Sequence, residues 1–351
     1  MSKAVVRALG LVARRAAHAG DSGADPARCS ACGDADAVLA QRGGGVVVRH
    51  GTAVAKAHAE ATDPLDHRAR LAVAAHPRLA GILLPPLATD AQAAENAAGR
   101  PVTAWPYGAP VDPDDPEGAP WEQAGTLVAR LHSVPLEAVR AGGLPYMRGP
   151  AKAARAVARM RAAGPCPAAV PVQRAWERLP AWARDEAAPP GPYALCHGDL
   201  HLGQLVRHPA PDGPWLLIDV DDLGIGDPAW DLARPAAWYA AGLLPPEIWQ
   251  RFLGAYRAAR GPAAPLADDP WPRLDIPARA LTVQTAALAI AKSAAENRDL
   301  DEVERLLVDA CARIAALPPQ LESAPSPPPR RRLNRPSPGA CSGDAGRTAR
   351  S

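Results

Sequence analysis

The sequence has few aromatic residues, few cysteines and almost no lysine. Aromatic side chains make up 4% of the 351 residues, with a single Phe. An interior packed mainly from Ala, Leu and Val favours closely packed helices over a thick β-sandwich. The six cysteines are too sparse and scattered for the disulfide framework of a small secreted domain. No uninterrupted apolar run reaches about 18 residues, so we expect no membrane partner.

The sequence also lacks an excess of charge of either sign. Its 39 Lys+Arg against 37 Asp+Glu leave a formal net charge of +2, which argues against a nucleic-acid partner. Basic residues interrupt the first apolar stretch, so it does not match a secretory signal, and we expect a cytoplasmic location. A hydrophobic content of 48% supplies a core for one large domain or two modest ones.

The two ends differ in composition from the middle of the chain. Residues 1–36 lack sustained apolar periodicity and are expected to form a flexible extension, in which one short helix could form. Residues 321–351 are rich in Pro, Arg and Ser, which predicts a disordered tail. Between them, residues 37–108 indicate a small sheet, and residues 109–320 indicate a larger helical part.

Apolar patterning locates several elements within these two parts. The expected strands cover residues 46–48, 54–56, 82–84 and 102–105. The expected helices include residues 63–75, 121–132 and 301–317. Two short extended runs, residues 193–196 and 215–218, interrupt the helical part, and each leads directly into a group of acidic residues.

These two acidic segments carry the predicted chemistry. The first reads CHGDLHLGQ over residues 196–204, and the second reads IDVDDLGIGDPAWDLA over residues 218–233. Two carboxylates and an amide brought together by a short hairpin can hold Mg²⁺, which prefers oxygen ligands. Phosphoryl transfer needs such a metal, a cation on the phosphates and a carboxylate for the acceptor hydroxyl. The segments therefore predict a phosphotransferase.

The same residues resemble the aminoglycoside phosphotransferase family. The resemblance rests on His197-Gly198-Asp199 and Gln204, followed by Asp219 and the GDP and Asp of residues 226–231, and it extends from about residue 37 to 317. It implies an α+β, bilobal protein-kinase-like fold with a small antiparallel-sheet N-lobe and a larger helical C-lobe. It also implies ATP (or GTP) and Mg²⁺ as cofactors and a small-molecule hydroxyl acceptor.

The resemblance assigns a role to each matching residue. Asp199 is the expected catalytic base, His197 braces its loop, and Gln204 and Asp219 are the expected magnesium ligands. Two further acids, Asp227 and Asp231, are expected to support the catalytic loop through hydrogen bonds. Gln204 stands where the family usually has Asn, although the maltokinase-like branch of the family resembles this sequence in reading HLGQ at that place.

Nucleotide contacts are expected from the N-terminal part. Lys56 is one of only four lysines in a chain that otherwise uses Arg, which suggests that a compact charge is required in its strand. It resembles the lysine that steadies the α- and β-phosphates, and Glu60, Asp63 and Asp66 are its candidate acidic partners. The remaining cofactor-binding candidates are Gly43, Gly44 and Gly45, which could form a turn over the phosphates, and Ala104 and Trp105, a hinge beside the adenine.

The acceptor substrate stays open at this level. Acids such as Asp268, Asp269, Glu296, Asp299 and Asp301 could line a pocket for a cationic aminoglycoside. A sugar or metabolite kinase, such as a maltokinase-like enzyme, is the first alternative. A catalytically inactive nucleotide-binding scaffold is the second. We expect a monomer or a weak homodimer.

Overall fold

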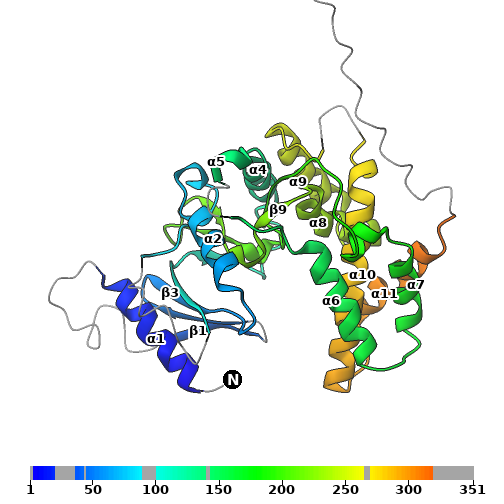
Figure 1. Ribbon diagram of the computed structural model, residues 1–351, viewed down its shortest axis with the longest axis horizontal. Coiled ribbons are helices and arrows are strands. Elements are labelled where there is room, and N and C mark those ends of the chain that lie inside the picture. Colours follow the sequence, from blue (N-terminus) through cyan, green and yellow to red (C-terminus); the bar gives the residue numbers. More distant parts are fainter. Residues whose placement is uncertain are drawn as a thin grey trace, which may run out of the picture. The chain divides into compact units, whose positions relative to one another are not determined.

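The computed structural model describes residues 3–19, 36–42, 45–88, 100–139, 143–264 and 269–318 (Figure 1). Its strands are β1 (Ala37–Arg42), β2 (Gly45–His50), β3 (Ala53–Ala57), β4 (Val102–Pro106), β5 (Ala109–Pro110), β6 (Ala194–Cys196), β7 (Leu205–Arg207), β8 (Trp215–Leu217) and β9 (Gly224–Gly226). Its α-helices are α1 (Lys3–Ala17), α2 (Pro64–Ala74), α4 (Trp121–His132), α5 (Leu136–Val139), α6 (Gly149–Ala162), α7 (Ala169–Glu177), α8 (Ala229–Ala241), α9 (Pro246–Ala258), α10 (Trp271–Glu296) and α11 (Glu302–Ala315). Short 3₁₀ turns include η5 (Leu202–Gln204) and η6 (Val220–Asp222).

The N-terminal part is built on a four-stranded antiparallel sheet in the order β1-β2-β3-β4. Side chains alternate between the two faces of a strand, so Ala55 and Ala57 of β3 face one side and Lys56 faces the other. Ala55 and Ala57 pack in the core that α1 covers, whereas Lys56 lies opposite Thr103 of β4 in register. The pleat alone therefore places Lys56 on the face away from α1.

Helix α1 corrects one expectation from the sequence. Residues 3–17 do not belong to a flexible extension, because Val5, Leu9 and Ala13 of α1 are buried against Val46 and other sheet residues. These three positions follow the helical spacing of four residues, but basic side chains around them hide the apolar stripe in the sequence. Residues 20–35 and the tail predicted for 321–351 lie outside the described residues.

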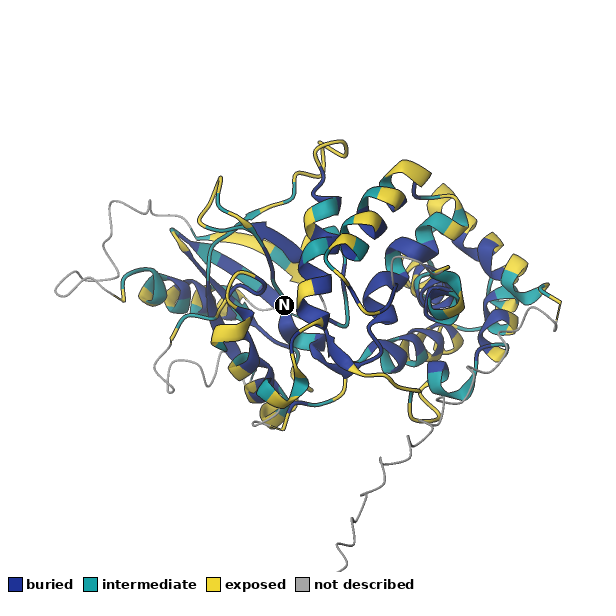
Figure 2. Cartoon of the chain, turned by 90° about the horizontal axis from the view of Figure 1, so that it is seen from above, coloured by how far each residue is buried: buried dark blue, intermediate teal, exposed yellow. Residues whose placement is uncertain are grey.

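The helical part holds the larger core. Helix α10 packs against α6, α8 and α11, and α4 packs against α9. In Figure 2 the buried residues, in dark blue, lie on the inner sides of these helices, and exposed residues, in yellow, lie on their outer sides. Tyr239 stacks on Trp249 and on Trp271, and the two Trp rings are tilted with centroids 6.1 Å apart, so the three side chains form one aromatic cluster against this core.

Most of the elements expected from the sequence are present, with ends shifted by one or two residues. Helix α2 begins at Pro64 because Asp63 caps it, accepting hydrogen bonds from the amides of Leu65 and Asp66 at 2.9 Å. The start of helix α11 is fixed by a capping box between the N-cap residue Asp301 and Glu304 in the first turn. The strand expected over residues 82–84 is wrong: that run makes only an isolated bridge, Leu83 to Leu217. None of the helices in the described part of the chain is both long and apolar enough to cross a membrane.

Candidate active site

Two β-ladders hold the two acidic segments next to each other. The segment 197–204 lies between β6 and β7, and the segment 218–223 lies between β8 and β9. Strand β6 pairs with β9, and β7 pairs with β8, so each segment is tied to the other at both of its ends. The amide of Ile218 also donates to the carbonyl of Gln204 at 2.9 Å. This topology brings together the two segments that the sequence predicts to form one site.

Asp231, in the first turn of α8, holds the start of the first segment. Its carboxylate accepts hydrogen bonds from the amides of His197 (2.6 Å) and Gly198 (2.8 Å) and lies 2.9 Å from His132 Nε2. Burial alone would raise the pKa of Asp231, but the hydrogen bond and charge of His132 outweigh it, so the pKa is lowered. Asp231 therefore stays an anion in the interior because its charge is fully bonded.

His197 and Gly198 connect the two segments. His197 is fully buried, and its Nε2 lies 2.8 Å from the carbonyl of Ile218, so the ring ties the first segment to the second. Gly198 has φ +83°, and a Cβ there would lie 2.3 Å from the carbonyl oxygen of Asp222. Only glycine permits both this backbone conformation and this close approach.

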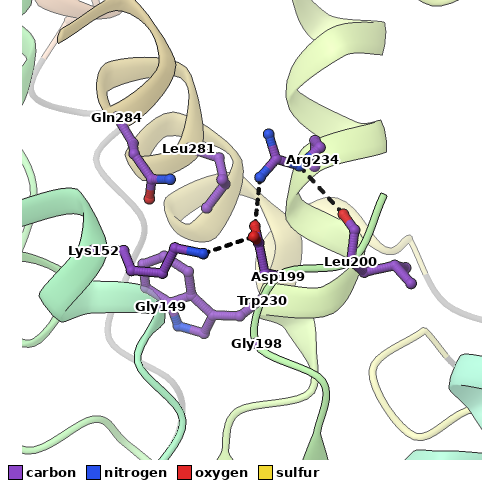
Figure 3. Close-up of a pocket in the computed structure, with 9 residues that line it drawn as sticks. All are labelled: Gly149, Lys152, Gly198, Asp199, Leu200, Trp230, Arg234, Leu281 and Gln284. Carbon is purple, nitrogen blue, oxygen red and sulfur yellow. Dashed lines mark hydrogen bonds and ion pairs between the residues drawn. The ribbon is translucent and has the colours of Figure 1, made fainter. Parts of the chain in front are cut away.

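Asp199 lies between two cations (Figure 3). Lys152 Nζ of α6 is 2.8 Å from its Oδ2, and Arg234 Nη2 of α8 is 2.7 Å from its Oδ1. Burial alone would raise the pKa of Asp199, but Lys152 and Arg234 outweigh it and lower the pKa to about 2. Asp199 is therefore ionised at all physiological pH values, with both oxygens directed at cations.

The second segment makes contact with two lysines. Asp219 adopts a left-handed backbone with φ 63°, which side chains other than glycine seldom adopt. Asp219 Oδ1 and Asp221 Oδ2 lie 2.6 and 3.0 Å from Lys56 Nζ. Asp222 Oδ2 lies 2.7 Å from Lys152 Nζ, the same ammonium that reaches Asp199. The turn that carries these three carboxylates thus connects Lys56 with the environment of Asp199.

Lys56 takes its acidic partners from this segment and not from α2 or the residues before it. Burial lowers the pKa of Lys56, but the carboxylates of Asp219 and Asp221 outweigh burial, and the net shift is upward. Asp63 caps α2, and Asp66 lies 3.9 Å from Arg70. Among the described residues, the acidic partners of Lys56 are therefore Asp219 and Asp221.

Gln204 is buried and contacts His201. Burial, followed by the charge of Arg234, lowers the pKa of His201 to about 4, so its ring is neutral near pH 7. The Gly203 amide donates to His201 Nδ1 at 3.0 Å, which leaves the ring proton on Nε2. That nitrogen lies 3.2 Å from the Gln204 amide nitrogen. Because N–H groups cannot accept one another's protons, the favourable arrangement turns the Gln204 amide so that Oε1 faces His201.

The other candidates have less direct positions. Asp227 accepts from the Ala229 amide at 3.0 Å and from Arg273 at 3.2 Å, contacts that fix the start of α8. Ala104 and Trp105 are buried in β4, and Trp105 Nε1 donates to Thr103 Oγ1. Gly45 lies in β2, and Gly43 and Gly44 lie outside the described residues.

The sequence analysis missed Lys152 and Arg234. Lys152 could have been identified from the sequence, because lysine is as rare at position 152 as at position 56. Two of the four lysines in the chain lie in this site. Arg234 lies one turn after Asp231 on α8, so a helical interpretation of the DLAR segment places both on related faces.

Fold and site together define a small-molecule phosphotransferase of the kinase-like class with a hydroxyl acceptor. The model of the phosphotransferase enzyme family, APH, matches residues 34–276, and the chain belongs to this family. A search of curated proteins found no match.

Solved structures support the protein-kinase-like α+β fold. An amicoumacin kinase in complex with AMP-PNP, Ca²⁺ and Ami aligns with TM-score 0.56 at 16% identity, covering 80% of this chain and 87% of that one. A spectinomycin phosphotransferase bound to ADP and spectinomycin aligns with TM-score 0.52 at 14% identity, covering 80% and 91%. A choline/ethanolamine kinase family protein from Mesorhizobium loti aligns with TM-score 0.51 at 16% identity, covering 83% and 91%.

Proposed function

We propose that the chain transfers the γ-phosphoryl group of ATP to a hydroxyl of a small molecule, with Asp199 as the base. One observation carries this proposal. Lys56 pairs with Asp219 and Asp221, and Lys152 pairs with Asp222 of the same turn and with Asp199, with no ion-pair separation above 3.0 Å. A phosphate cation, metal-ligating acids and a base for the acceptor are the groups that phosphoryl transfer requires.

The donor set suits magnesium. Asp219 and Gln204 would hold the ion, because a carboxylate and an amide oxygen are hard oxygen ligands and leave positions for water and phosphate. The Asp219 side chain is 34% exposed, so one of its oxygens is accessible while the other contacts Lys56. When bound, magnesium neutralises charge on the phosphate oxygens. Lys56 is held ready to contact the phosphates by the same carboxylates.

Asp199 acts on the acceptor. The acceptor oxygen forms the new bond to the γ-phosphorus, the bond from that phosphorus to the β,γ-bridging oxygen breaks, and the acceptor proton passes to Asp199. A carboxylate with a pKa of about 2 is a weak base, so its main contribution before bond formation is to orient the hydroxyl. Lys152 and Arg234 hold that carboxylate in place.

The charges around Asp199 favour a sugar or other metabolite over an aminoglycoside as acceptor. Among the described residues, the pocket at Asp199 is lined by two cations, Lys152 and Arg234, against one acid. Three of the acids proposed from the sequence have other partners: Glu296 pairs with Arg298, Asp269 accepts the Trp271 amide, and Asp301 caps α11. Asp268 lies outside the described residues. A polycation would meet repulsion at this pocket.

An acceptor panel tests the proposal. Purified protein is incubated with ATP and Mg²⁺ and with neutral sugars, hydroxy acids, amino alcohols or aminoglycosides, and phosphorylated products are identified by mass spectrometry. We expect a phosphorylated product from a neutral or anionic acceptor and none from aminoglycosides. Preferred phosphorylation of aminoglycosides would contradict the acceptor assignment. Tight ATP binding without a product from any acceptor would favour the inactive scaffold.

A further inference from the structure

Three buried or half-buried side chains meet on the side of Lys56 that faces α2. His58 follows β3, His67 lies in the first turns of α2, and Asp221 lies in η6. Each offers one ligand atom, and these three atoms lie within 4.8 Å of one another. The imidazole ring centroids of His58 and His67 are 4.2 Å apart. Three separate elements therefore bring two imidazoles and a carboxylate to one point.

The hydrogen bonds of the protein do not account for this cluster. The His67 side chain is only 7% exposed, and its Nε2 has no hydrogen-bond partner among the residues that the structure describes. A buried polar nitrogen without a partner is costly and calls for a ligand. His58 is 1% exposed, and its Nδ1 lies 2.8 Å from Asp221 Oδ1.

A second cluster of similar composition gives the contrast. His132, Cys196 and Asp231 also lie close enough to share an ion. There, however, His132 contacts Tyr256 and Asp231 through its two ring nitrogens, at 2.9 Å each. Asp231 accepts two backbone amides as well, so that cluster is satisfied as a hydrogen-bond network. Of these two clusters, only the one beside Lys56 has a buried imidazole nitrogen without a hydrogen-bond partner among the described residues.

The surroundings of the cluster match those of a metal ligand set. His58 Nε2 is 2.7 Å from Thr103 Oγ1, a partner that can fix the ring with Nδ1 directed at the cluster. Thr103 is itself fixed, because Trp105 Nε1 donates to it at 2.8 Å. The two carboxylate oxygens of Asp221 contact different residues: Oδ1 contacts His58, and Oδ2 lies 3.0 Å from Lys56. The carboxylate can bind an ion through one oxygen and keep Lys56 on the other.

We propose that His58, His67 and Asp221 form a site for a divalent transition-metal ion of the zinc class. Two imidazole nitrogens and one carboxylate oxygen suit zinc and disfavour magnesium, which prefers oxygen ligands alone. Zinc bonds of about 2.0–2.1 Å require ligand atoms roughly 3.4 Å apart in a tetrahedron. Small side-chain rotations must therefore adjust the cluster, moving His58 Nδ1 and Asp221 Oδ1 apart from 2.8 Å. Three protein ligands leave the fourth position open for water.

The site is coupled to Lys56 through Asp221. The ammonium group of Lys56 and the metal ion compete for the negative charge of one carboxylate, so metal binding weakens the hold of Asp221 on Lys56. This consequence rests on the proposed function, in which Lys56 contacts the nucleotide phosphates. Binding of the metal itself does not rest on it, and is measured without ATP or acceptor.

Calorimetric titration of the chelator-treated protein, without a histidine tag, with Zn²⁺ tests the site, and visible absorption of bound Co²⁺ reports its ligand geometry. We expect one equivalent of Zn²⁺ to bind and a tetrahedral Co²⁺ spectrum. His67→Phe and His58→Phe should each abolish both signals, with unchanged far-UV circular dichroism. His76→Phe, which alters a histidine outside the cluster, should keep them. Failure of the unaltered protein to bind Zn²⁺, or retention of binding by both ligand variants, would overturn the proposal.

Two further variants separate metal binding from mere packing. Thr103→Val removes the hydroxyl that contacts His58 Nε2 but keeps the shape of the threonine side chain. This change should weaken Zn²⁺ binding about 10- to 100-fold. Lys56→Met removes the competing cation and should lower the Zn²⁺ dissociation constant. If the two histidines only pack against each other, neither change should alter the Zn²⁺ dissociation constant. An unchanged dissociation constant in both variants would therefore refute the proposed coupling and ligand set.

Discussion

Replacing Asp231 by Asn should destabilise the fold and disable the site through the same contacts. Asp231 is 1% exposed and accepts the amides of His197 and Gly198 and contacts His132. An Asn keeps one acceptor oxygen, but its NH₂ group then faces an N–H donor. One backbone amide loses its partner, and His132 loses the carboxylate beside its Nε2.

The size of the effect follows from the number of contacts. Hydrogen bonds to a charged group contribute roughly 1.5–3 kcal/mol each, and Asp231 takes part in three such contacts. Because these contacts share one carboxylate, their losses do not add fully. We expect the free energy of unfolding to fall by about 3–5 kcal/mol.

Urea unfolding followed by circular dichroism measures this change. The matched control is Asp114→Asn, an exposed acid whose replacement should change stability by less than about 0.5 kcal/mol. Under conditions where the Asp231→Asn variant stays folded, phosphotransfer should still be reduced, because the segment carrying Asp199 is no longer fixed. A loss below about 1 kcal/mol with full activity would refute the role given to Asp231.

Three other changes test separate parts of the structure. Gly198→Ala should lower both activity and thermal stability, because its Cβ would lie 2.3 Å from the Asp222 carbonyl oxygen; a fully active variant would contradict this close contact. Leu9→Ala should cost about 2–5 kcal/mol in urea unfolding if α1 is part of the sheet core, whereas a flexible extension would give no loss. The pKa of Asp199, lowered from 3.8 to about 2, adds about 2 kcal/mol of stability that is present above about pH 4 and is lost as pH falls toward 2. Stability measured against pH should therefore fall less steeply in Asp199→Asn than in the unaltered protein below about pH 4, and parallel curves would contradict the shift.

Local patterns predicted the elements and the order of the two acidic segments well. The helical spacing of apolar residues placed α2 and α11 to within two residues of their ends. The structure adds the cap at Asp63 and the capping box at Asp301 and Glu304, contacts between residues two or three apart. The HGD and IDVDD segments located the site because each directly follows a short strand.

Contacts between distant segments could not be predicted in this way. Lys152 reaches Asp199 only because α6 packs beside the first acidic segment, and nothing within either segment encodes that packing. Lys56 pairs with Asp219 and Asp221 because the sheet face opposite α1 meets η6, a contact set by the tertiary fold. For α1, arginines between the apolar positions obscured a stripe whose meaning depends on the sheet that it covers.

The role of Asp199 is the central claim, and single-turnover phosphotransfer by Asp199→Asn tests it most directly. With nucleotide affinity measured in parallel, we expect the rate of the chemical step to fall about 10²- to 10⁴-fold while ATP binds as well as before or better, since Lys152 and Arg234 lose an anionic partner. An unchanged rate with the same acceptor would contradict the account.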